Sequence, residues 1–237
     1  VDTANGGTSG GSITNNGQTT GLNVGAAGST ILTTPMAAGI GIGTGVAPLK
    51  TTTAAAGGTI TLKTGSGGAF IGNAGDVTLG TTLGGGPAPL AVIATGNLTT
   101  TGAINTAGGA VSLVAQNALN VTGNITAGAG AVTLKANQDG LSTDGFSQTN
   151  PTTISGTNVA ITVNTPGTSA GVGGGAVVSN ITDLGALSIT TNNATNNSTG
   201  SITRTPASTL TATTGITLTT GAGTIGTGTG ANAISLA

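Results

Sequence analysis

Histidine, cysteine and glutamate are absent from this 237-residue chain. Their absence removes the commonest general acid or base, the thiol nucleophile and the imidazole metal ligand together. The acidic residues are five aspartates, which are spread along the sequence: Asp2, Asp76, Asp139, Asp144 and Asp183. We therefore expect no catalytic residues, no enzyme activity and no cofactor. We interpret the aspartates as turn residues whose carboxylates accept hydrogen bonds from nearby backbone.

Charge and aromatic side chains are also scarce, at 4% and 1% of the residues. The four cations, Lys50, Lys63, Lys135 and Arg204, form no cluster in the sequence, and there is no Trp or Tyr. Nucleic acid is therefore not an expected partner, because both the electrostatic and the stacking contributions to binding are missing. No run of about 20 apolar residues occurs, so membrane insertion is not expected either. A nearly neutral surface lacks the repulsion that keeps copies apart, which favours self-association.

The chain does contain a regular series of short motifs in which aliphatic and polar residues alternate; each such motif is called a word below. The word Ala110-Val111-Ser112-Leu113 returns as Ala131-Val132-Thr133-Leu134 about 21 residues later, which is the length of one coil of a three-sided β-solenoid. Alternation of aliphatic and polar residues sends the two kinds of side chain to opposite faces of a strand. The pattern predicts an all-β parallel β-helix with about three short strands per coil. It also predicts that Val111 stacks on Val132 and Leu113 on Leu134.

The spacing of these words divides the chain into three parts. Residues 1–56 are expected to form irregular N-terminal coils or an extended arm, and residues 57–136 a regular β-solenoid. Residues 137–237 are expected to continue the β-solenoid with longer loops and tight final coils, because the words lie further apart there. The predicted loop insertions are 138–151, 165–176 and 192–206.

Three kinds of candidate site remain. Asp139 and Asp144 are weak candidates for a metal ion in a loop, although we expect no metal site. If they met Asp183 and either Arg204 or Lys135 in a groove, a polysaccharide-degrading β-helix would be favoured. The sequons at Asn193, Asn196 and Asn197 are glycosylation candidates. Thr-x-Thr pairs leave open a ligand-binding adhesin whose Thr/Asn-rich face binds carbohydrate or ice.

The repeat words themselves are similar to those of a known family. Gly-Asn-Leu-Thr-Thr, Gly-Ala-Ile-Asn-Thr-Ala-Gly-Gly-Ala-Val-Ser-Leu and Ala-Leu-Asn-Val-Thr-Gly-Asn-Ile-Thr-Ala-Gly resemble the repeat region of filamentous-haemagglutinin-type bacterial exoproteins. The resemblance covers about residues 57–237 and is strongest over 95–136. It implies a right-handed β-helical shaft, located outside the cell on a bacterial surface or in a secreted matrix.

The leading hypothesis is therefore a structural protein: a subunit or shaft of a cell-surface fibre, sheath or adhesin. The end coils of a solenoid expose unpaired strand edges, so head-to-tail association with further copies is expected. The residues expected in this contact are Ile225, Ile234 and Leu236. A cell-surface or matrix polysaccharide is a further candidate partner.

Overall fold

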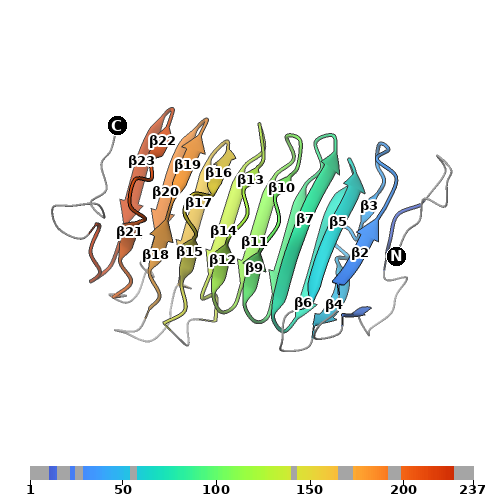
Figure 1. Ribbon diagram of the computed structural model, residues 1–237, viewed down its shortest axis with the longest axis horizontal. Coiled ribbons are helices and arrows are strands. Elements are labelled where there is room, and N and C mark those ends of the chain that lie inside the picture. Colours follow the sequence, from blue (N-terminus) through green and yellow to red (C-terminus); the bar gives the residue numbers. More distant parts are fainter. Residues whose placement is uncertain are drawn as a thin grey trace.

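The computed structural model describes residues 11–14, 22–24, 29–53, 58–139, 143–164, 173–191 and 199–226. Within these ranges the secondary structure consists of 23 β-strands and contains no helix. The strands stack side by side along one long axis, with β2 and β3 towards one end of the stack and β22 and β23 towards the other (Figure 1). All strand pairings are parallel, so the chain is an elongated all-β protein of the solenoid type.

One sheet has ten strands, which pair in the order β1-β4-β6-β8-β11-β14-β17-β20-β23, with β3 beside β6. Their bounds are β1 Leu22–Val24, β3 Gly41–Ile42, β4 Leu49–Thr53, β6 Gly68–Ala74, β8 Leu90–Ala94, β11 Val111–Ala115, β14 Val132–Ala136, β17 Val159–Val163, β20 Ala186–Thr190 and β23 Gly215–Thr219.

The other sheet has thirteen strands and divides into two arms at β7 (Val77–Gly85). β2 (Ser29–Thr33) and β5 (Thr59–Gly65) precede β7. One arm contains β9 Leu98–Thr100, β12 Leu119–Val121, β15 Phe146–Gln148, β18 Ala176–Val178 and β21 Ile202–Arg204. The other contains β10 Ile104–Asn105, β13 Ile125–Thr126, β16 Thr153–Gly156, β19 Asn180–Asp183 and β22 Leu210–Ala212.

From β8 onward, each strand pairs with the strand three places later in the sequence. The predicted register is confirmed, because Val111 lies opposite Val132 and Leu113 opposite Leu134. Between β4 and β9 the step shortens to two strands, as in β4–β6, β5–β7, β6–β8 and β7–β9, whereas β1–β4, β2–β5 and β3–β6 are three strands apart. The long β7 pairs through Val77–Leu79 with β9 and through Thr82 and Leu83 with β10. This single strand therefore occupies the place that two separate strands occupy in the following coil.

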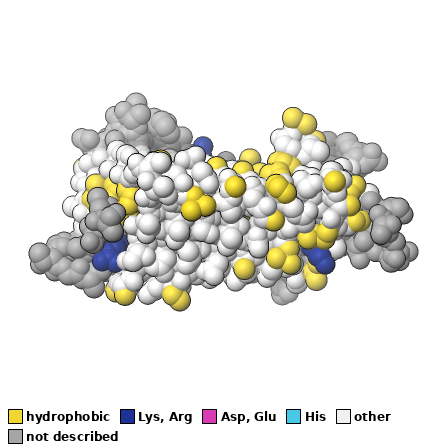
Figure 2. All heavy atoms as spheres, turned by 90° about the horizontal axis from the view of Figure 1, so that it is seen from above, with side chains coloured by type: hydrophobic (Ala, Val, Ile, Leu, Met, Phe, Trp, Pro, Cys, Tyr) yellow, Lys and Arg dark blue, Asp and Glu magenta, His cyan; other side chains and the backbone are white. Residues whose placement is uncertain are grey.

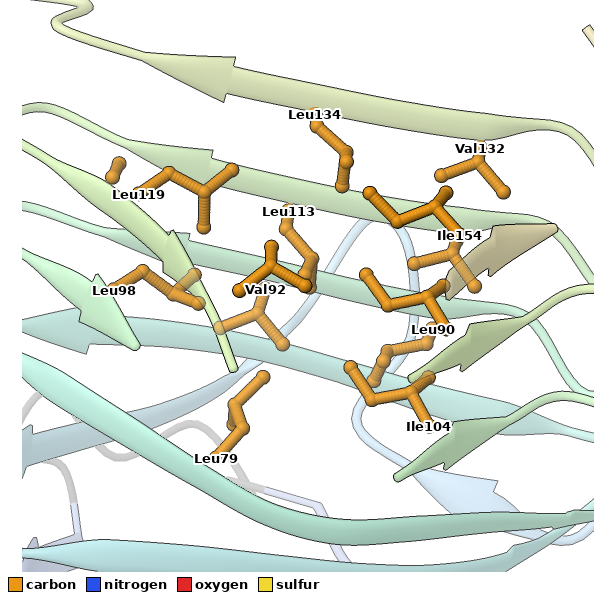
Figure 3. Close-up of a cluster of buried hydrophobic side chains, with 14 of the residues drawn as sticks. Leu79, Leu90, Val92, Leu98, Ile104, Leu113, Leu119, Val132, Leu134 and Ile154 are labelled. Carbon is orange, nitrogen blue, oxygen red and sulfur yellow. The ribbon is translucent and has the colours of Figure 1, made fainter. Parts of the chain in front are cut away.

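The core is a narrow column of aliphatic side chains between the strands (Figure 3). Within the ten-stranded sheet, one row runs through the fully buried Val92, Leu113, Leu134 and Ile161. Apart from Phe146, the buried hydrophobic side chains among the described residues are Ala, Val, Ile and Leu. Burial of each Leu or Ile contributes roughly 1.5–3 kcal/mol to folding.

Two of the segments predicted as loop insertions contain strands. β15 (Phe146–Gln148) lies inside 138–151, and β21 (Ile202–Arg204) lies inside 192–206. Each has one apolar residue that points into the core, Phe146 or Ile202, and these residues stack in register through Ala176. The alternation is too short to be recognised in the sequence, so only pairing with the neighbouring coil reveals these strands.

The corners between strands depend on residues that tolerate a left-handed backbone or a very close approach. Asn137, Asn158 and Asn164 have φ of 51°, 57° and 75°, as expected of Asn at such corners. Gly123 is required for a different reason. A Cβ at this position would lie 2.1 Å from the carbonyl oxygen of Gly102 in the preceding coil.

Candidate functional site

Asp183 is one of the three aspartates in the enzyme hypothesis, and its carboxylate is part of the fold. It is 1% exposed at the end of β19. Oδ1 accepts hydrogen bonds from the backbone N–H groups of Asn158 (2.8 Å) and Gly185 (2.7 Å), and Oδ2 accepts one from Val159 (2.7 Å). The bond from Gly185 is the local contact expected of a turn aspartate, whereas the bonds from Asn158 and Val159 join this corner to the preceding coil.

Asp76 has a related but more accessible role. Its Oδ1 accepts a hydrogen bond from the backbone N–H of Asn97 (2.8 Å), and the Asn97 side chain lies 3.3 Å from both carboxylate oxygens. The Oδ1 of Asn97 in turn accepts from the Ala118 N–H of the next coil (3.1 Å). The Asp76 carboxylate and the Asn97 side-chain amide therefore link three successive coils at one corner.

The weak metal candidates Asp139 and Asp144 follow β14 and precede β15, and both are half-buried. Among the residues that the structure describes, no group of three or more His, Cys, Asp or Glu could hold a metal ion. Arg204, which the enzyme hypothesis required beside the acids, donates from Nη1 to the carbonyl oxygen of Ser208.

A buried column of polar residues at another corner was missed by sequence reasoning. Asn137 donates from Nδ2 to Oδ1 of Asn164 (2.8 Å), and Asn164 donates to the carbonyl oxygen of Thr191 (2.6 Å). All three are at most 1% exposed. These three residues directly follow β14, β17 and β20. In the sequence, the column could have been recognised from the polar residue that comes after each of these strands. Their position indicates a structural role.

A row of outward-facing residues runs along β2, β5, β7 and the arm from β9 to β21, and all of them except Val177 carry a hydroxyl or amide group. The strand register aligns Ser29, Thr59, Thr78, Thr99, Asn120, Ser147, Val177 and Thr203 in one row. Strand spacing places neighbours in such a row about 4.8 Å apart. The Thr-x-Thr pairs do not share one face: Thr99 belongs to this row, Thr211 to the other arm, and Thr217 to the ten-stranded sheet.

The rest of the visible surface is also weakly charged. Figure 2 shows small groups of hydrophobic side chains separated by polar side chains and backbone, with few basic atoms. Within the described ranges, no helix is long and apolar enough to cross a membrane. Such a surface presents few charges with which to repel a second copy of the chain.

The C-terminal end of the described stack exposes part of the core. Leu218 on β23 is in register with Ile189 and Ile216 with Leu187, yet Leu218 and Ile216 are only half-buried whereas their partners are buried. In the pairing order β23 follows β20 and is the last strand described. Its second edge therefore has no partner strand among the described residues.

Ile225 lies near this end and is 48% exposed. It forms an isolated parallel bridge with Ile202 of β21, in which Ile202 N–H donates to the carbonyl oxygen of Thr224 (2.9 Å). The other residues expected in assembly, Ile234 and Leu236, lie outside the described residues. The glycosylation candidates Asn193, Asn196 and Asn197 also lie outside them.

Comparisons with protein-family models, with curated proteins and with solved structures found no match to this chain.

Proposed function

We propose that this chain is a non-catalytic structural protein, a β-solenoid subunit or shaft of a bacterial cell-surface fibre, sheath or adhesin. We further infer a right-handed coil with about three strands per turn. From β8 onward each strand pairs with the third strand after it, which supports three strands per turn. Right-handedness is supported by the strong preference of parallel strand connections for that hand.

The observation that carries the proposal is the half-exposed core at the C-terminal end of the described stack. Ile216 and Leu218 present aliphatic surface, and among the described residues the second edge of β23 has no partner strand. A second copy that placed its N-terminal strands against β23 would bury both side chains and continue the ladder of backbone hydrogen bonds. This contact joins different surfaces of two copies and does not close, so it produces a filament.

Weak surface charge and the repeat style support an extracellular location at the bacterial surface or in a secreted matrix. A chain with 4% charged residues has little electrostatic repulsion between neighbouring copies. The resemblance of its repeat words to filamentous-haemagglutinin-type shafts fits the same location. In this proposal the function lies in the length, stiffness and continuity of the rod.

Two lysine substitutions on β23 test the assembly. Leu218→Lys places a charge in the end of the core, whereas the control Thr217→Lys places one on the exposed outer side of the same strand. We expect filaments of the wild type and of Thr217→Lys in negative-stain micrographs, and short rods of Leu218→Lys. A wild-type chain that remains monomeric in light scattering as its concentration is raised would refute the proposal.

The row of hydroxyl and amide side chains favours a second candidate, an adhesin whose polar face binds carbohydrate. Thr78, Thr99 and Asn120 offer regularly spaced donors and acceptors without charge, which suits a neutral polymer. Co-sedimentation with insoluble polysaccharides tests this candidate. Thr99→Val should weaken a genuine interaction, because it removes one hydroxyl from the middle of the row and keeps the side-chain shape.

A further inference from the structure

A groove of about 360 Å³ lies on the outer face of the ten-stranded sheet, above β6. Its floor is formed by Gly72 and Ala74, the two smallest residue types. Gly72 is in register with Lys50 on β4 and with Ile93 on β8, so two long side chains rise on either side of a residue that has none. The groove is therefore a consequence of residue size along the rows of the sheet.

The walls are mainly apolar, with hydroxyl groups towards one end. Ile93 is 52% exposed and faces the groove from one side, while Pro48 lines it beside Lys50. Thr52 and Thr95 line the part of the groove above Ala74. A bound ligand would therefore be removed from water and packed against apolar side chains along most of its length.

The floor is held rigidly from beneath. The buried Asn73 accepts a hydrogen bond at Oδ1 from Thr51 Oγ1 (2.8 Å) and donates from Nδ2 to Thr53 Oγ1 (3.0 Å), which fixes β6 to β4. It also donates to the carbonyl oxygens of Gly75 (3.0 Å) and Asp76 (3.1 Å). A floor braced in this way changes little on binding, which lowers the cost of ordering the site.

The width of the groove limits what can enter it. β4 and β8 are two strand spacings apart, roughly 9.5 Å between backbones. An α-helix with its side chains has a diameter of about 10–12 Å and would not reach the floor. An extended alkyl chain fits between the walls. No aromatic side chain lines the groove, so the stacking surface that commonly receives a sugar ring is missing.

Lys50 is the one charged residue among those that line the groove, and none of the lining residues is acidic. We propose that this groove binds an alkyl chain that ends in a carboxylate, with the chain against Gly72, Pro48 and Ile93 and the carboxylate beside the Lys50 ammonium. This inference is independent of filament formation.

The test uses decanoate titrated into the full chain and followed by isothermal calorimetry. We expect saturable binding to the wild type and loss of binding to Gly72→Val. A side chain can be placed here, because a Cβ at position 72 meets only Pro48 Cγ, at 3.8 Å, and the two methyl groups of valine then occupy groove volume. Ala160→Val, on the outer side of β17 in the same sheet, is the matched control and should bind like the wild type.

The charge is tested separately. Lys50→Gln should raise the Kd for decanoate about five-fold, as expected from loss of a solvent-exposed ion pair. Lys135→Gln, in the same row of the sheet but outside the groove, should not change it. Decanol should bind the wild type about as weakly as decanoate binds Lys50→Gln.

Three results would overturn the assignment. One is the absence of decanoate binding to the wild type, and another is equal binding to Gly72→Val. The third is tighter binding of galacturonate than of decanoate, which would assign the groove to an acidic sugar. Should Gly72→Val fail to fold, Ile93→Asn removes the apolar wall from an exposed position and must weaken decanoate binding.

Discussion

Replacing Asp183 by Ala should destabilise the protein far more than its place at a surface corner suggests. The carboxylate is 1% exposed and accepts hydrogen bonds from three backbone N–H groups, of which those of Val159 and Gly185 are buried. A buried donor that loses its acceptor costs about 1–3 kcal/mol, so two such donors cost roughly 2–6 kcal/mol. Asp183→Asn should lie between the wild type and Asp183→Ala. It keeps one acceptor oxygen, while its amide nitrogen would face a backbone donor.

Asp76→Ala is the matched comparison. It removes a carboxylate from an equivalent kind of corner, but the Asn97 N–H that it leaves is only partly buried. Water can replace the lost acceptor there, so we expect a loss of about 1 kcal/mol.

The free energy of unfolding is best measured by urea denaturation followed by far-ultraviolet circular dichroism, because the chain has no Trp or Tyr for fluorescence. Using the Leu218→Lys background keeps association from contributing to the apparent stability. If Asp183→Ala lost less than about 1 kcal/mol, or no more than Asp76→Ala, the role assigned to the buried carboxylate would be wrong.

Two further predictions concern the core and the corners. Leu134→Asp should abolish cooperative unfolding of the surrounding coils, because an unpaired carboxylate would replace a fully buried side chain; a midpoint within error of the wild type would contradict the register. Gly123→Ala should lower the melting temperature by several degrees, because its Cβ would lie 2.1 Å from the Gly102 carbonyl oxygen. Gly72→Ala, where the nearest atom is 3.8 Å away, should leave the melting temperature nearly unchanged.

The sequence determined the strand character of the chain and the register of its most regular part. Alternation of aliphatic and polar residues specifies which face of a strand is buried, and the return of the same word specifies which residues stack. Val111 over Val132 followed from these two facts alone. The preference for Asn at corners also followed from local physics, because the left-handed backbone region is strained for most other residues.

The tertiary structure decided those contacts between neighbouring coils that no repeated motif marks in the sequence. Two of the three partners of Asp183, the N–H groups of Asn158 and Val159, belong to the preceding coil, so no local pattern could identify its carboxylate as buried. β15 forms around Phe146 because Leu119 and Ala176 lie in register on either side of it. The groove above Gly72 exists because Lys50 and Ile93 occupy the same row of the sheet. A glycine leaves a groove only when its neighbours in space have large side chains, and the sequence alone does not show those neighbours.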